Sequence, residues 1–215
     1  QWGEKEVTAG YLQKLKEAGN FLMDLIGNIL EVARIESGKE TLTETAWNLC
    51  NLEDTLDLLL DRDIYKKQLT LKKNMELQHP KVYCDVLKIQ EITMNLLSNA
   101  VKYTPEGGTI HFTIRELPYE REGYALFQTV VEDTGIGISK EYIPHLFEAF
   151  SREKSSSESG IIGTGLGLRI VKKFVDLMEG SIVVESEIGE GTRFTVTIPH
   201  RIATANEYIS EENAK

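Results

Sequence analysis

The stretch from residue 85 to residue 108 reads DVLKIQEITMNLLSNAVKYTPEGG. Asp85 is suited to cap a helix, because its carboxylate can accept hydrogen bonds from the backbone N–H groups that a first helical turn leaves free. The run Thr104-Pro105-Glu106-Gly107-Gly108 marks the other end, since proline cannot continue a helix and glycine favours a turn. The pattern predicts a helix over residues 86–103.

Two amides and a cation share one face of this predicted helix. Asn95, Asn99 and Lys102 stand at i, i+4 and i+7, and Tyr103 closes the helix. An amide oxygen is a neutral hard ligand that suits Mg²⁺, and a lysine offsets phosphate charge. Asparagines on a helix are also often solvated or bonded to the backbone, so this face alone leaves both interpretations open.

A turn with two glycines follows an apolar strand that includes Val130 and Val131. It reads Asp133-Thr134-Gly135-Ile136-Gly137. A carboxylate at the end of a strand can accept a hydrogen bond from an exocyclic amine such as that of adenine, and glycines let the backbone approach the ring. The alternative is an ordinary turn in which Asp133 binds neighbouring N–H groups.

A glycine-rich run begins another predicted helix, over about residues 166–179. It reads Gly163-Thr164-Gly165-Leu166-Gly167-Leu168 and follows the polar residues 151–160. Free N–H groups and the dipole at a helix N-terminus favour phosphate. The glycine spacing matches neither a Rossmann turn nor a P-loop. The hinge of a flexible lid, formed by residues 151–160, is the alternative.

The beginning of the chain is expected to form one long helix, from about Thr8 to Ser37, ended by Gly38. At 1.5 Å per residue this helix would be roughly 45 Å long. Its apolar residues form an a/d seam, widened by Leu25, Leu30 and Val32, so we expect it to pack against more than one partner, as in a four-helix arrangement. The seam consists of Leu12, Leu15, Leu22, Ile26, Ile29 and Ala33.

Helices and strands do not alternate regularly in the remainder. Asn51 is suited to cap a helix that runs to about Lys67. Strands are expected over residues 69–75, 109–117, 125–132, 182–186 and 193–198, the last two joined by a turn at Gly189-Glu190-Gly191, and the tail after Pro199 should be loose. The fold class predicted is α+β, a two-layer sandwich with helices on one face of a mixed sheet, preceded by the long helix.

Composition excludes several classes of partner. The chain has 24 basic and 34 acidic residues, so its net charge of -10 repels nucleic acids and anionic lipid surfaces. No apolar run approaches the roughly 20 residues that cross a bilayer, and no signal-peptide pattern is present. We expect a cytoplasmic segment without membrane contact. The first residue, Gln1, is compatible with a fragment of a longer protein that is anchored in the cell membrane.

The order of these segments resembles the catalytic domain of sensor histidine kinases, which has the GHKL (Bergerat) ATP-binding fold. Residues 91–103 are similar to the N box and residues 133–137 to the G1 box. Phe147-Glu148-Ala149-Phe150 is similar to the F box, residues 163–168 to the G2 box, and Gly189-Glu190-Gly191-Thr192 to the final glycine turn. The resemblance covers nearly the whole chain.

The resemblance implies ATP and Mg²⁺ as cofactors and a role for each site residue. Asn99 would coordinate Mg²⁺, Asn95 and Lys102 would support the phosphates, Tyr103 would lie against the nucleotide, and Asp133 would bind the adenine amine. Arg152, just past the F box, is similar to a lid arginine that reaches the terminal phosphates. The nucleotide would also contact residues of the glycine-rich turns: Gly135, Gly137, Gly163, Thr164, Gly165, Leu166, Gly167, Leu168 and Thr192.

The resemblance also implies a domain division. Residues 1–40 would be the second helix of the dimerisation and phosphoacceptor domain, residues 41–200 the catalytic domain, and residues 201–215 a polar tail. The phosphorylated histidine of this family is followed by an acidic residue, then Arg or Lys, Thr and Pro. None of the four histidines fits: His79, His111, His145 and His200.

The expected function is therefore transfer of the γ-phosphoryl of ATP to a histidine on a helix outside these residues, for relay to a response regulator. The full-length protein would be a homodimer. Two alternatives remain at this stage: a GHKL ATPase that drives a conformational cycle, and a non-enzymatic nucleotide-binding scaffold. GHKL ATPases carry a glutamate one turn before the metal-binding asparagine, where this chain has Asn95.

Overall fold

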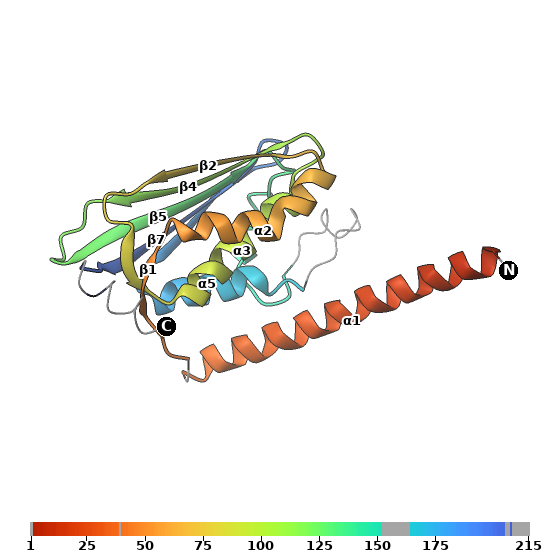
Figure 1. The fold of residues 1–215 in the computed structure, drawn as a ribbon, viewed down its shortest axis with the longest axis horizontal. Coiled ribbons are helices and arrows are strands. Elements are labelled where there is room, and N and C mark those ends of the chain that lie inside the picture. The colour runs from red at the N-terminus through yellow and green to blue at the C-terminus, as the bar shows by residue number, and fades with distance from the viewer. Residues whose placement is uncertain (1, 39, 152–163, 205–206, 208–215) are drawn as a thin grey trace.

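The computed structural model describes residues 2–38, 40–151, 164–204 and 207. A single long helix, α1 (Trp2–Glu36), precedes a domain built on one sheet and runs along the helical side of that domain (Figure 1). The predicted long helix is confirmed and begins about six residues earlier than expected. The side chains of Leu12 and Leu15 on its seam are 62% and 69% exposed.

The sheet has seven strands in the order β1-β3-β7-β5-β4-β2, with β6 also paired to β7. Among the strand pairs of the described residues, β2 and β4 alone run in parallel and the others are antiparallel, so the sheet is mixed. The strands are β1 (Thr45–Asn48), β2 (Thr70–Glu76), β3 (Lys81–Cys84), β4 (Thr109–Leu117), β5 (Tyr124–Asp133), β6 (Ser181–Glu187) and β7 (Gly191–Ile202).

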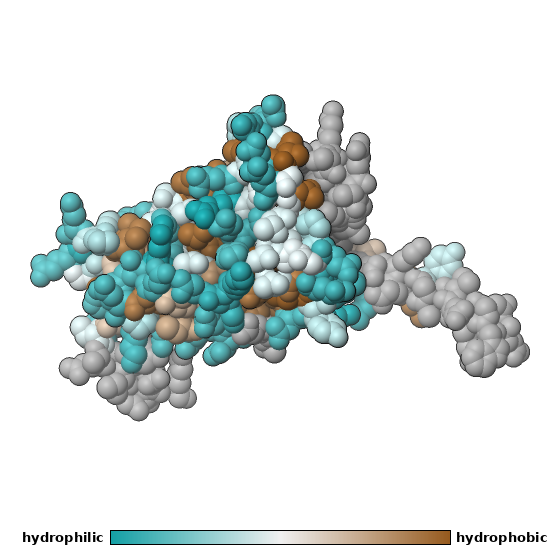
Figure 2. All heavy atoms as spheres, turned by 90° about the horizontal axis from the view of Figure 1, so that it is seen from above, coloured by the Kyte–Doolittle hydropathy of each residue, from teal (hydrophilic) through white to brown (hydrophobic). Residues whose placement is uncertain are grey.

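Within the part of the chain that the structure describes, one face of the sheet is covered by α2 (Asn51–Lys66), α3 (Val86–Tyr103) and α5 (Gly167–Leu177) (Figure 1). A short 3-10 helix, η1 (Ile143–His145), follows β5. The core lies between these helices and the sheet and includes Leu56, Leu96, Phe112 and Phe174, all fully buried. Viewed from above, the molecule is mostly hydrophilic with scattered hydrophobic residues (Figure 2). The α+β class with helices on one face is confirmed.

Three local predictions were wrong. The four-residue strands β1 and β3 were not foreseen, and Cys50 rather than Asn51 precedes the first residue of α2. Strand β7 continues to Ile202, so the tail does not begin after Pro199. On one side of β7 the pairing with β6 ends at Thr197 and the pairing with β3 begins at Arg201. Pro199 thus lies between the two paired segments, where a backbone N–H would have no strand partner on that side, so proline is tolerated here.

Helix α3 is held at both ends by charged side chains. At its start, Asp85 Oδ1 accepts a hydrogen bond from Lys88 N at 3.2 Å, as the sequence predicts. At its end, Lys67 Nζ donates to the carbonyl oxygens of Val101, Lys102 and Thr104 at 2.7, 2.9 and 2.9 Å. An ammonium group satisfies carbonyls that the last helical turn leaves free and interacts favourably with the negative end of the helix dipole.

We expect Lys67→Met to lower the free energy of unfolding by roughly 2–3 kcal/mol, because three half-buried carbonyls lose a charged donor. Chemical denaturation of the variant and of the parent measures this difference. Lys66→Met is the matched control: its side chain is exposed at the neighbouring position, so its effect should stay within about 0.5 kcal/mol. Equal stabilities of the two variants would contradict the assignment.

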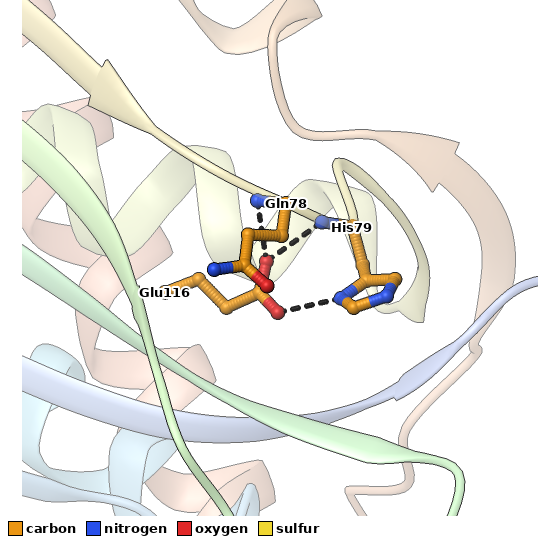
Figure 3. A network of polar contacts seen from close by, with 3 residues as sticks. All are labelled: Gln78, His79 and Glu116. Carbon is orange, nitrogen blue, oxygen red and sulfur yellow. Dashed lines mark hydrogen bonds and ion pairs between the residues drawn. The ribbon is translucent and has the colours of Figure 1, made fainter.

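A second polar network fixes the connection between β2 and β3 (Figure 3). One carboxylate oxygen of Glu116 accepts from Gln78 N at 2.8 Å and His79 N at 2.7 Å, and the other contacts His79 Nδ1 at 2.6 Å. Burial by itself would raise the pKa of Glu116, but the hydrogen bonds from His79 and Gln78 lower it below its usual value. The network ties this connection to the end of β4.

Candidate nucleotide-binding site

A cavity of about 210 Å³ lies among α3, the turn after β5 and the start of α5. It gathers most of the predicted site residues, although they are up to 97 positions apart in the chain. The predicted residues that line it are Asn95, Asn99, Lys102, Tyr103, Asp133, Gly137, Thr164, Gly165, Gly167, Leu168 and Thr192. Gly135 and Leu166 do not line it, and Gly163 and Arg152 lie outside the described residues.

The α3 wall of the cavity presents Asn95, Asn99, Lys102 and Tyr103, all half-buried. Asn95 Nδ2 donates to the Glu91 carbonyl oxygen at 3.0 Å, which fixes the amide. Its Oδ1 then faces the start of α5, where a Cβ on Gly167 would come within 2.4 Å of it. A larger residue at position 167 would have to displace the Asn95 amide, so α3 and α5 approach each other closely here. The Lys102 ammonium lies 5.2 Å from the centre of the Tyr103 ring.

Asp133 occupies the floor of the cavity at the end of β5 and is only 6% exposed. Burial raises the pKa of its carboxyl to about 6, although hydrogen bonds from the Gly135 and Thr192 backbones act in the opposite direction. The bond from Gly135 N to Asp133 Oδ1 is 2.8 Å long. The hydrogen bond from a neighbouring N–H group, which the sequence left as the alternative role of Asp133, is therefore present. The same residue also lines the cavity.

The turn after β5 packs against the β6–β7 turn. Gly137 has φ +70°, and a Cβ there would lie 1.9 Å from the Glu187 carbonyl oxygen. Gly189 N donates to the Ile136 carbonyl oxygen at 2.9 Å, and Ile138 N donates to Ser186 Oγ at 2.9 Å. The turn after β5 lines the cavity through Ile136, Gly137 and Ile138, and the β6–β7 turn packs against it and adds Thr192 to the lining.

The start of α5 also lines the cavity, through Gly167 and Leu168. Helix α5 begins at Gly167, and within the described residues its N-cap residue, Leu166, makes no side-chain capping hydrogen bond. Thr164 Oγ1 accepts from Leu166 N at 3.3 Å, just before the helix. Free backbone N–H groups at a helix N-terminus suit an anion such as phosphate, which supports the interpretation of the glycine-rich run.

The cavity is also lined by seven residues that sequence reasoning did not assign to the site: Asn28, Ile136, Ile138, Tyr142, Leu146, Ser151 and Phe194. Ile136 lies within the Asp133 turn, and Ile138 follows it directly, so an apolar wall beside the turn could have been foreseen. Asn28 comes from α1, more than 60 residues from the nearest predicted site residue. No signal in the sequence indicates its position.

A metal ion would find few ligands of its own here. Within the described ranges no group of three or more His, Cys, Asp or Glu side chains could hold one. The Asn99 amide is a hard ligand on the cavity wall, and it fits an ion held mainly by waters and phosphate oxygens, as Mg²⁺ prefers. The residues present thus suit Mg²⁺ that arrives with a nucleotide.

Glu91 lies on α3 beside the site but does not line the cavity. Burial, then the nearby carboxylates of Glu31 and Glu40, raise its pKa to about 7, although Lys88 acts in the opposite direction. Lys88 Nζ is engaged with Glu40 at 2.7 Å and with Asp85 at 3.3 Å. Burial likewise raises the pKa of Glu31, which reaches this cluster from α1.

This cluster predicts a pH-dependent stability. Because the folded state raises the pKa of Glu91 from 4.5 to about 7, the folded chain binds its proton more tightly, and the free energy of unfolding falls as pH rises through that window. Glu91→Gln should therefore stabilise the domain by on the order of 1 kcal/mol at pH 8 and have little effect at pH 4. Thermal unfolding at both pH values measures this. Glu120→Gln, in an exposed loop, is the control and should change stability little at either pH. If Glu91→Gln raised the stability equally at both pH values, the expectation would be contradicted.

None of the helices in the ranges that the structure describes is long and apolar enough to span a membrane. The four histidines stand away from the cavity lining: His79 binds Glu116, His145 Nδ1 contacts Glu148 at 2.8 Å, and His111 is exposed on β4. His200 is buried within β7, and burial lowers its pKa to about 4.

Comparison with known proteins identifies the family. Residues 84–202 match the model of the histidine kinase-, DNA gyrase B-, and HSP90-like ATPases. The chain is 36% identical over 191 residues to hybrid signal transduction histidine kinase B of Dictyostelium discoideum, covering 88% of this chain and 10% of that protein. It is 36% identical over 190 residues to the sensor protein GacS of Pseudomonas syringae pv. syringae, covering 87% of this chain and 21% of that protein.

Solved structures of histidine kinases have the same fold as this chain. Full-length ShkA in complex with AMPPNP superposes with a TM-score of 0.75 and 26% identity, over 92% of this chain and 40% of that one. The catalytic domain of the histidine kinase ThkA superposes with a TM-score of 0.61 and 27% identity, over 74% of this chain and 96% of that one. The chain spans only 10% and 21% of the length of the two curated relatives named above. It belongs to the histidine kinase-, DNA gyrase B- and HSP90-like ATPase family, as the ATP-binding catalytic domain of a histidine kinase.

Proposed function

We propose that this chain binds Mg-ATP in the cavity between α3 and α5 and presents the γ-phosphoryl group to a histidine on a dimerisation-domain helix. The observation that carries this proposal is the convergence of Asn99, Lys102, Asp133 and the start of α5 on one cavity. A buried acceptor at one end suits the adenine amine. A cation and free helix N–H groups suit the phosphates.

Each residue has a proposed task. The Asp133 carboxylate accepts a hydrogen bond from the adenine amine, and Tyr103 lies against the nucleotide. Lys102, Asn95 and the N–H groups of α5 hold the phosphates, and Arg152 neutralises charge at the terminal phosphate. Asn99 would hold Mg²⁺, which when bound neutralises phosphate charge. Phosphoryl transfer mainly requires positioning and charge neutralisation, so this domain needs no nucleophile of its own.

The rival proposal is an ATPase that drives a conformational cycle. The ATPases that resemble this chain orient the attacking water with a glutamate one helical turn before the metal-binding asparagine. The residue one turn before Asn99 is Asn95, whose amide is held by the Glu91 carbonyl oxygen, and Glu91 itself does not line the cavity. The kinase function is therefore favoured, and rapid steady ATP hydrolysis by this chain alone would count against it.

The wider setting is also proposed from the family. Helix α1 would belong to the dimerisation and phosphoacceptor domain, the full-length protein would be a homodimer, and the phosphoryl group would pass to a response regulator receiver domain. The segment would act in the cytoplasm, in a parent protein that is anchored in the cell membrane.

Calorimetric titration with AMPPNP tests the proposal. The parent chain should bind AMPPNP with Mg²⁺ and bind it more weakly with EDTA, and Asp133→Asn should lose preference for adenine over guanine nucleotides. With labelled ATP, the chain alone should form no stable phosphohistidine. If no nucleotide bound to the chain or raised its melting temperature, a non-enzymatic module that binds partners without using ATP would replace this proposal.

A further inference from the structure

Among the described side chains of helix α1, that of Asn28 reaches the candidate nucleotide site. Asn28 lines the cavity, and its Nδ2 donates to Thr164 Oγ1 at 3.3 Å. Both residues are half-buried. This contact joins a helix that precedes the domain to the glycine-rich turn before α5.

The contact is part of a larger docking surface. Glu36, at the end of α1, forms an ion pair with Arg169 in the first turn of α5. Val32 and Ile35 of α1 are partly buried against the domain core. Asn28 is therefore held in place by contacts further along the same helix.

The hydrogen bonds of Thr164 leave its proton for a ligand. A hydroxyl has two acceptor sites and one O–H donor. Thr164 Oγ1 accepts from Asn28 Nδ2 and from Leu166 N, both at 3.3 Å, so both acceptor sites are in use. Among the residues that the structure describes, no acceptor for the Thr164 O–H is recorded. A hydroxyl whose two lone pairs are both engaged can take part in a further hydrogen bond only as a donor. Its ligand must therefore be an acceptor, such as a phosphate oxygen.

We propose that Asn28 is a positioning residue of the nucleotide site, which orients the Thr164 hydroxyl as a donor to a phosphate of the bound nucleotide. The helix α1 thus completes the phosphate end of a cavity that otherwise belongs to the catalytic domain. This inference rests on the proposed function, because it requires a nucleotide with phosphates in this cavity. It also links nucleotide affinity to the docking of α1.

The test is calorimetric titration of the whole chain with AMPPNP and with adenosine, which has no phosphate. Asn28→Ala should weaken AMPPNP binding about five-fold, the value of one neutral hydrogen bond, and leave adenosine binding unchanged. Thr164→Val should also weaken AMPPNP, and the double variant should bind no more weakly than Thr164→Val alone, since the two residues act through one hydroxyl. Thr164→Ser keeps the hydroxyl and should bind as the parent does.

Asn74→Ala is the matched control, because Asn74 is exposed on β2 and its amide binds only the Glu76 side chain among the described residues. The inference would be overturned if Asn28→Ala bound AMPPNP as tightly as the parent, or if it lost equal affinity for AMPPNP and for adenosine. It would also be overturned if the losses of AMPPNP affinity in the two single variants added up in the double variant. A parent chain that binds no nucleotide would instead overturn the proposed function.

Discussion

Replacing Asn99 with alanine is expected to abolish Mg²⁺-dependent nucleotide binding. Asn99 is the amide on the α3 wall that we propose as the Mg²⁺ ligand, and the described part of the chain offers no carboxylate or histidine cluster that could replace it. Without it, the ion would be held by phosphates and water alone. Loss of a metal-holding group of this kind should reduce affinity on the order of 100-fold.

Titration of AMPPNP with Mg²⁺ and with EDTA measures this effect. The Asn99→Ala variant should bind AMPPNP equally weakly in both conditions, whereas the parent should prefer Mg²⁺. Ser98→Ala is the matched control in the same turn of α3, because Ser98 is exposed and its hydroxyl binds only the Asn95 carbonyl oxygen in the described ranges. If Asn99→Ala kept the affinity of the parent in Mg²⁺, the metal assignment would be wrong.

Replacing Gly137 with alanine should destabilise the domain by roughly 3 kcal/mol or more, through two effects. Its φ of +70° costs a residue with a Cβ about 1–2 kcal/mol. The new Cβ would also lie 1.9 Å from the Glu187 carbonyl oxygen, so the two glycine turns would have to separate. Because Gly137 itself lines the cavity, nucleotide affinity should fall together with stability.

Gly189 in the facing turn separates the two effects. It also has a positive φ, +84°, but no atom lies within 4 Å of where its Cβ would be. Gly189→Ala should therefore cost only the backbone term, about 1–2 kcal/mol. Chemical denaturation of both variants measures the difference. Equal losses would show that the turns can shift apart freely and that Gly137 is not a point of close packing.

Local chemistry explains which predictions succeeded. Helix α3 and strand β4 have the predicted bounds, since Asp85, Pro105 and the glycines after it act within a few residues of the positions they control. The four-residue strands β1 and β3 could not be foreseen in this way. Their extended conformation depends on pairing with each other and with β7, which is distant in sequence.

Long-range packing explains the rest of the site. The pKa of Glu91 depends on Glu31 and Glu40, which precede the domain, and on burial that no single segment specifies. Asn28 enters the cavity because α1 docks against the domain, where Glu36 pairs with Arg169 and Val32 and Ile35 pack on the core. A periodic apolar pattern predicts that α1 packs, but it does not specify against what.

The sequence by itself determined the helices and most strands, the glycine turns, and the types of residue that suit a nucleotide, because caps, prolines and glycines act on their own neighbourhood. Only the tertiary structure decided that Asn99, Asp133 and Gly167 surround one cavity, that Lys67 caps α3, and that Asn28 joins the site. Those contacts connect residues separated by tens of positions, and their formation depends on how the whole sheet and its helices pack.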